Sequence, residues 1–125
     1  MILHSKMIAY ERYDYTMIAG LNWYFPVKSR PGGVILVHAI SIYNNSGANY
    51  GAMYKAVRIK GEVHRLNYTA SLNNGLVKRW MEDYYITNGA EFGVGITPNA
   101  AGETTQVSFQ TIHFTDVDYN KIFGL

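Results

Sequence analysis

The sequence predicts an all-β protein: one antiparallel two-sheet sandwich, jelly-roll-like, with about eight strands over residues 1–125. Turn-forming residues punctuate the chain at short intervals, β-branched and aromatic runs fill those intervals, and few uninterrupted stretches could form a helix. The clearest turn signals are Pro31-Gly32-Gly33, Asn44-Asn45-Ser46-Gly47, Asn73-Asn74-Gly75, Asn88-Gly89 and Pro98-Asn99. A chain of 125 residues can bury one hydrophobic core, which predicts a single domain.

Residues 1–25 are rich in aromatic side chains, and two interpretations of this segment stay open. Tyr13, Tyr15 and Met17 alternate, and Leu21 to Phe25 reads as a second short strand, so the segment can supply the first strands of the sandwich. Alternatively, it is an N-terminal aromatic arm that contacts a neighbouring subunit. The side chains predicted to form such an interface are Tyr10, Tyr13, Tyr15, Trp23 and Tyr24.

The run from Val34 to Tyr43 (VILVHAISIY) is apolar at both strand parities. Such a run is typical of a central strand covered on both faces, or of a buried helix. Turn signals on both sides and several β-branched residues favour the strand.

Three further strands are predicted in the middle of the chain, at Met53 to Ile59, Val63 to Tyr68 and Leu76 to Ile86. Lys55 breaks the apolar parity of the first of them. A partly helical segment is the alternative for the third, because four of its apolar residues also fit a 3.6-residue period: Val77, Trp80, Met81 and Tyr84.

The segment after Asn88-Gly89 shows the strictest alternation in the chain. Phe92, Val94 and Ile96 share one parity, which predicts a core-facing row. The opposite parity carries two glycines, so another backbone or a large aromatic ring can approach that face closely.

The last predicted strand, Gln106 to Tyr119, changes phase along its length. Val107 and Phe109 share one parity, whereas Ile112 and Phe114 share the other. One extra residue between the two pairs, a β-bulge, would return both pairs to the core, and a switch of the chain from one sheet to the other is the alternative.

The composition favours a protein that acts by contact. Charged residues make up 16% of the chain, and eleven tyrosines supply rings that suit either an interface or ordinary strand positions. The eleven Lys and Arg residues are scattered rather than gathered into a basic stripe, so we expect no nucleic-acid partner. No apolar run approaches the roughly 20 residues of a membrane span, so we expect no membrane partner.

The side chains that carry chemistry form no recognisable motif. The chain has no cysteine, which excludes disulfides, thiolate zinc sites and a cysteine nucleophile within these residues. The four histidines, His4, His38, His64 and His113, lack metal-ligand spacing. Asp116 and Asp118 could bind calcium, but surface charges are the favoured interpretation. We therefore expect no catalytic site, no metal site and no cofactor, and hence a protein that is not an enzyme.

Two stretches carry a resemblance to a known class of proteins. The first runs from Pro31-Gly32-Gly33 through the apolar strand to Asn44-Asn45-Ser46-Gly47. The second runs from Tyr84 through Asn88-Gly89 and the Phe92-containing strand, and on to the last strand. In these lines the chain resembles small β-sandwich accessory proteins of tailed phage and related virions. The likeness spans Pro31 to Tyr119 and leaves out the first 25 residues.

The resemblance implies a structural virion protein, such as a capsid-decorating, neck or tail component, that is assembled in the host cytoplasm. Its expected partners are copies of itself and other virion proteins. The alternative is a carbohydrate-binding module for host attachment, with rings that stack on a sugar. The candidates for stacking are Trp23, Trp80, Tyr84 and Tyr85.

Overall fold

The computed structural model describes residues 7–115, which form nine β-strands. The strands are β1 (Met7–Thr16), β2 (Asn22–Lys28), β3 (Gly33–Tyr43), β4 (Met53–Ile59), β5 (Glu62–Thr69), β6 (Val77–Trp80), β7 (Tyr84–Thr87), β8 (Glu91–Ile96) and β9 (Thr104–Thr115). The described part of the chain contains no helix, so the helical alternative for residues 76–86 is wrong. It also contains no helix long and apolar enough to cross a membrane.

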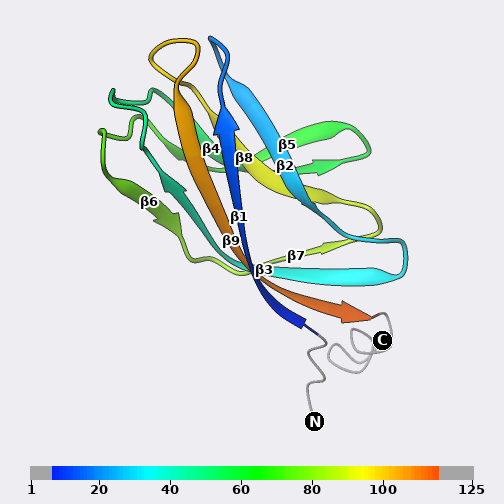
Figure 1. Ribbon diagram of the computed structural model, residues 1–125. Coiled ribbons are helices and arrows are strands. Elements are labelled where there is room, and N and C mark those ends of the chain that lie inside the picture. Colours follow the sequence, from blue (N-terminus) through cyan, green and yellow to red (C-terminus); the bar gives the residue numbers. More distant parts are fainter. Residues whose placement is uncertain (1–6, 116–125) are drawn as a thin grey trace.

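The strands form two antiparallel sheets that face each other (Figure 1). Sheet A has the order β1-β9-β3-β6, with β7 also paired to β3, and sheet B has the order β2-β8-β4-β5. One set of hydrogen-bonded pairs is nested: β1 with β9, β2 with β8, β3 with β6 and β7, and β4 with β5. The pairs β3 with β9 and β4 with β8 join these hairpin arms side by side within each sheet. A long hairpin rolled across two sheets has this pairing, which is the jelly-roll topology. The predicted fold class is confirmed.

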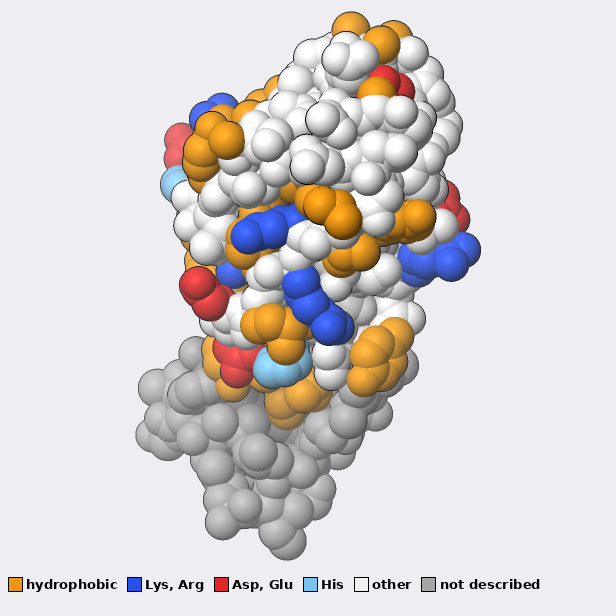
Figure 2. Space-filling view, turned by 90° about the vertical axis from the view of Figure 1, so that its left-hand side faces the viewer, with side chains coloured by type: hydrophobic (Ala, Val, Ile, Leu, Met, Phe, Trp, Pro, Cys, Tyr) orange, Lys and Arg blue, Asp and Glu red, His pale blue; other side chains and the backbone are white. Residues whose placement is uncertain are grey.

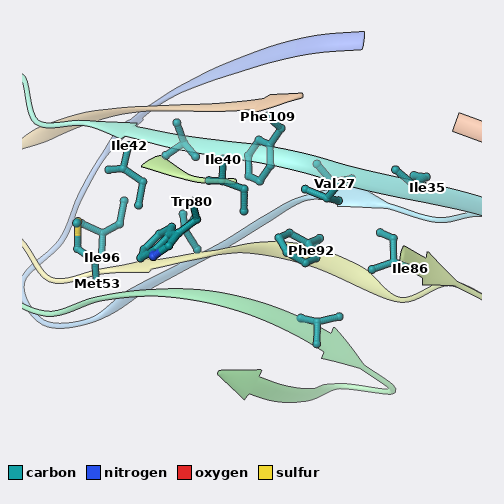
Figure 3. Packing of buried hydrophobic residues seen from close by; sticks show 14 of the residues in the cluster. Val27, Ile35, Ile40, Ile42, Met53, Trp80, Ile86, Phe92, Ile96 and Phe109 are labelled. Carbon is teal, nitrogen blue, oxygen red and sulfur yellow. The ribbon is translucent and has the colours of Figure 1, made fainter. Parts of the chain in front are cut away.

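The core lies between the two sheets and is almost wholly apolar (Figure 3). Ile40 and Ile42 of β3 and Phe109 of β9 enter it from sheet A, and Phe92 and Ile96 of β8 enter it from sheet B; each is at most 1% exposed. Alternation along β8 and β3 therefore places one row of side chains in the core, as the sequence predicts.

The single strand expected at residues 76–86 is instead two short strands. β6 pairs with Ile40–Tyr43 of β3, and β7 pairs with Val34–Val37. Between these halves β3 has a bulge at His38, where its register with β9 shifts. The bulge turns the strand, so its two halves need separate partners. If β6 and β7 are counted as one interrupted strand, the described chain has the eight strands that the sequence predicts.

The bulge predicted in the last strand is wrong in its location. β9 keeps a continuous register with β1 over its whole length, and the extra residue belongs to β3. Ile112 and Phe114 face away from the main core and join Val34 and Leu36 in a second buried cluster on the other face of sheet A. The apolar parity of β9 changes after Phe109 because Ile112 and Phe114 belong to this second cluster and not to the main core. Residues 116–119 of the predicted strand lie outside the described residues.

Candidate interaction surface

The outer face of sheet B is flat over much of β8, because two of the three outward positions of this strand are glycines, Gly93 and Gly95. The ring of Trp23 in β2 lies against Gly95, where a Cβ would come within 2.6 Å of Trp23 Cζ3. A Cβ at Gly93 would collide with the backbone carbonyl of Tyr24, next to a register shift in β2. The sequence predicts a close approach at these glycines, and the structure identifies a ring and a backbone as the groups that approach.

Four aromatic rings from β2, β4 and β5 form a row across this face and pass over the glycines of β8. Phe25 and Trp23 of β2 are stacked with centroids 5.9 Å apart, and Trp23 lies 5.8 Å from Tyr54 of β4. Tyr54 in turn lies 5.4 Å from Tyr68 of β5, its direct cross-strand partner. Each ring is partly or largely exposed, and Tyr68 is 61% exposed. The row therefore presents aromatic surface to solvent.

Arg58 of β4 covers one end of the row. Its guanidinium lies 4.4 Å from the centroid of Phe25 and donates two hydrogen bonds to Glu91, of 3.1 Å from Nε and 2.8 Å from Nη2. The hydrogen bond from Arg58 holds the pKa of Glu91 below its ordinary value. A paired, two-pronged arginine of this kind is held in one orientation.

Arg65 of β5 covers the middle of the row without an acidic partner. Its guanidinium lies 4.4 Å from the Tyr54 ring and 5.7 Å from the Trp23 ring. Within residues 7–115 no carboxylate forms an ion pair with Arg65. We call this surface the platform; it consists of Trp23, Phe25, Tyr54, Arg58, Arg65 and Tyr68. Of the two arginines on the platform, Arg58 is paired with Glu91, and Arg65 has no ion-pair partner within residues 7–115.

The five residues predicted for an interface divide between three places. Tyr10 on the outer face of β1 is 77% exposed, and Trp23 belongs to the platform. Tyr13, Tyr15 and Tyr24 are half-buried against the core at the side of the sandwich where β1 faces β2. The interface role of all five stays a prediction.

Tyr13, Tyr15 and Tyr24 make close contacts within the chain. The rings of Tyr15 and Tyr24 stack with centroids 3.7 Å apart and link the two sheets. Tyr13 meets Phe109 edge-on at 6.0 Å and donates a 3.2 Å hydrogen bond to Glu11. Burial, with the neighbouring phenols, raises the pKa of Tyr15 to about 12. Each of these rings thus contributes to the fold before any partner binds.

The residues predicted to stack on a ligand do not share a surface. Trp80 is 7% exposed and belongs to the core (Figure 3). Tyr84 packs on Phe92 with centroids 5.4 Å apart, also on the core side. Tyr85 is 40% exposed on the opposite face of β7. The exposed aromatic row is the platform instead, which shares only Trp23 with the predicted residues.

The side of the molecule that carries β6 offers no comparable surface. Leu76, Val77 and Met81 are each more than half exposed there. Figure 2 shows that the hydrophobic side chains on this side lie in small patches separated by Lys, Arg and polar groups. Scattered apolar side chains of this kind are ordinary on a protein surface.

The three histidines in the described range have different neighbours. His38 Nδ1 lies 2.5 Å from Asp83, His64 lies 3.9 Å from Glu62, and His113 lies 3.2 Å from Thr111. No group of three or more His, Asp or Glu side chains in residues 7–115 could hold a metal ion. Asp116 and Asp118, the possible calcium ligands, lie outside the described residues.

A pocket of about 510 Å³ lies where the β2–β3 turn meets the end of β9. The charged residues that line it are Glu11, Lys28 and Arg30, and His113 lines it as well. A single carboxylate and two cations suit an anionic group better than paired acid–base catalysis, which needs two convergent carboxylates.

Sequence reasoning missed most of the platform. Tyr54 and Arg58 share the outward parity of β4, a signal that was available. Arg65 and Tyr68 have opposite parities in the sequence, yet both lie on the outer face, because the register between β4 and β5 shifts between Lys55 and Ala56. Such a bulge leaves no clear trace in a single sequence.

No protein-family model and no curated protein matches this chain. Among solved structures, one from Bacillus endospore appendages that form disulfide-linked pili is similar, with a TM-score of 0.53 and 14% identity over 92% of this chain and 94% of that one. A chain of infectious bursal disease virus, strain Gt, aligns with a TM-score of 0.41 and 8% identity over 89% of this chain and 32% of that one. At such identity the first likeness concerns the fold alone.

Proposed function

We propose that this chain is a structural subunit that assembles with copies of itself and with other proteins through direct contacts. The observation that carries the proposal is the platform. Trp, Tyr and Arg are the side chains most enriched at the energetic centres of protein interfaces. On the platform Trp23 lies directly against Gly95 and its ring packs beside Phe25 and Tyr54, so these rings have little conformational freedom to lose on binding.

The finer form of the proposal is a virion accessory protein, as capsid decoration or in a neck or tail, assembled in the host cytoplasm. The jelly roll is a fold of viral capsid domains, and the resemblance of residues 31–119 to phage accessory proteins points the same way. The similar appendage structure is a pilus, which extends the proposal to filaments. Those pili are disulfide-linked, whereas this chain has no cysteine. Its assembly is therefore expected to persist in dithiothreitol.

The test compares wild type with Arg65→Glu and Tyr68→Ala by sedimentation velocity and electron microscopy. Both side chains are exposed, so the monomer should fold normally while the assembly weakens. Loss of an interface centre typically costs about 2 kcal/mol or more of binding, or roughly thirtyfold in the dissociation constant. Ile18→Ser is the matched control, because Ile18 is 72% exposed but lies off the platform. Assembly that is unchanged in both platform variants would contradict the proposal.

A carbohydrate-binding module is the second candidate, and the row of exposed rings favours it. Jelly rolls also include lectin domains, and aromatic rings can stack on sugar rings. The arginines at 4.4 Å over Phe25 and Tyr54 occupy part of the stacking surface, which makes this candidate the weaker one. A glycan array decides it: specific binding by wild type that Tyr68→Ala abolishes supports a sugar ligand, and an array without signal excludes one from the set tested.

A further inference from the structure

Four strand edges bound the two sheets, and β1 differs from the other three. β2 contains Pro26 and a register shift, and β5 pairs with β4 across a bulge. The β6 and β7 edge is broken into two four-residue strands. Prolines, bulges and short strands are the devices that prevent a sheet edge from pairing with another chain.

β1 has none of these three devices. It runs for ten residues without proline or glycine, in continuous register with β9, and pairs with no other described strand. At every second residue of β1 the backbone N–H and C=O groups therefore point away from the sheet, free of a strand partner among the described residues. Its charges are the remaining feature that could block or direct pairing.

Those charges favour one register for pairing β1 with a second copy of itself, because an axis at Tyr13 is the only one that sets two opposite charges of β1 directly across from each other. A two-fold axis perpendicular to an antiparallel sheet places one residue opposite its own copy. An axis at Glu11, Arg12 or Asp14 would set like charges directly opposite each other, which is unfavourable. An axis at Tyr13 sets Arg12 of each copy opposite Asp14 of the other copy, so the symmetric dimer contains two such ion pairs. Arg12 and Asp14 are each about 60% exposed and only 3.6 Å apart within one chain, so both can reach a partner.

We propose that two copies of this chain pair through their β1 strands, antiparallel and centred on Tyr13, so that the two A sheets become one continuous sheet. The inference goes beyond the proposed function, because such a dimer can form whether or not the platform binds another protein.

The same register places the three tyrosines of β1, Tyr10, Tyr13 and Tyr15, in contact with the second copy. On the core side it brings Tyr13 against its own copy and Tyr15 opposite Glu11 of the second copy. On the outer face it places Tyr10, which is 77% exposed, over Thr16 of the second copy. Aromatic cross-strand pairs stabilise antiparallel sheets. Pairing therefore covers the most exposed aromatic side chain among the described residues.

Charge complementation tests the proposal. Wild type should form a dimer in sedimentation equilibrium between about 1 μM and about 1 mM. Arg12→Asp and Asp14→Arg each place like charges opposite each other at both symmetric sites and should weaken the dimer at least about tenfold. An equimolar mixture of the two variants restores opposite charges across the axis and should form a heterodimer, although each chain keeps like charges at positions 12 and 14.

A wild type that stays monomeric, or variants that dimerise as well alone as mixed, would overturn the proposal.

Disulfide trapping tests the register separately. The chain has no native cysteine, so any disulfide must form between the introduced residues. Tyr10→Cys mixed with Thr16→Cys should give a mixed disulfide, because residues directly opposite in a sheet lie within bonding reach.

Tyr10→Cys alone is the off-register control, because its two copies lie six residues apart in this register, and it should give little disulfide; a yield from Tyr10→Cys alone equal to that from the mixture with Thr16→Cys would refute the register. If a charge variant fails to fold, the cysteine pairs decide alone. Arg65→Glu should leave both results unchanged, which separates this edge from the platform.

Discussion

Lys55 is the one charged side chain among the described residues that is buried, and it faces the core side of β4. It is 3% exposed and shares its face with Met53 and Val57. Burial lowers the pKa of Lys55, and the nearby charge of Glu82 opposes this shift in part. The sequence marks Lys55 as the exception to the apolar parity of its strand, and the structure keeps it on the apolar side.

Lys55→Met is expected to stabilise the protein by about 1 kcal/mol at neutral pH, because methionine fills similar volume without a charge to bury. The sign of the pH dependence follows from the lowered pKa. The unfolded chain binds the proton more tightly, so the wild type gains stability as the pH rises through the folded pKa towards 10.5.

The advantage of Lys55→Met should therefore shrink over that range. Urea unfolding at about pH 7 and at about pH 10 measures it, and an advantage that grows with pH would contradict the assignment.

Tyr15 gives an opposite pH dependence. Its pKa is raised from 10.0 to about 12 by burial, so its contribution to stability is complete below pH 10 and is lost as the pH rises towards 12. Tyr15→Phe should flatten this loss without removing it, because burial also raises the pKa of Tyr13, Tyr24 and Tyr50.

The measurement is the free energy of unfolding in urea at several pH values above about 9, together with tyrosinate absorbance. Equal slopes for wild type and Tyr15→Phe would show that Tyr15 ionises as readily in the folded chain as in the unfolded one.

At the scale of elements, the contact between β2 and β8 depends on glycine. Gly95→Ala would place a methyl group 2.6–2.9 Å from three atoms of the Trp23 ring, so the ring must move. We expect a loss of about 1–3 kcal/mol in stability and a weaker platform. Gly51→Ala is the control, because its new Cβ would lie at an ordinary 3.6 Å from Thr97. Denaturant unfolding and near-ultraviolet circular dichroism report both effects, and equal stability of the two variants would contradict the prediction.

Strands β3 and β9 illustrate what alternation can predict. Val34 to Tyr43 is apolar at both parities, and the first half of β3 is indeed buried on both faces: Ile35 and Val37 belong to the main core, and Val34 and Leu36 to the second cluster. The same second cluster explains the phase change in β9, for which the sequence suggests a bulge or a switch of the chain between sheets; β9 does neither and stays in sheet A. A row of apolar residues predicts burial of a face, but it does not say which body of the protein covers that face.

At the scale of the whole molecule, the two proposed contacts lie on different parts of the sandwich. The β1 edge pairs two copies about a two-fold axis and closes on itself, whereas the platform lies on the outer face of sheet B. A closed contact gives a dimer, and a second contact is needed to extend dimers into a larger particle or filament.

This arrangement predicts the products of combined variants. Asp14→Arg should leave only platform contacts, Arg65→Glu should leave edge-paired dimers, and the double variant should be a monomer. Sedimentation velocity and electron microscopy distinguish these species, and the effects of the two substitutions on the free energies of association should add because the sites share no residue. A double variant that still assembles would require a third contact.

The sequence by itself determined the class of the fold, the row of core residues in β8 and the position of the main turns. These depend on local chemistry: alternation follows from strand geometry, and turns such as Asn88-Gly89, where both residues have positive φ, need particular residues. Only the tertiary structure decided that β6 and β7 are separate strands, that Arg65 and Tyr68 join Trp23, and that β1 is an unbroken edge. Each of these depends on register between strands distant in the chain, and a bulge of one residue changes which side chains share a face.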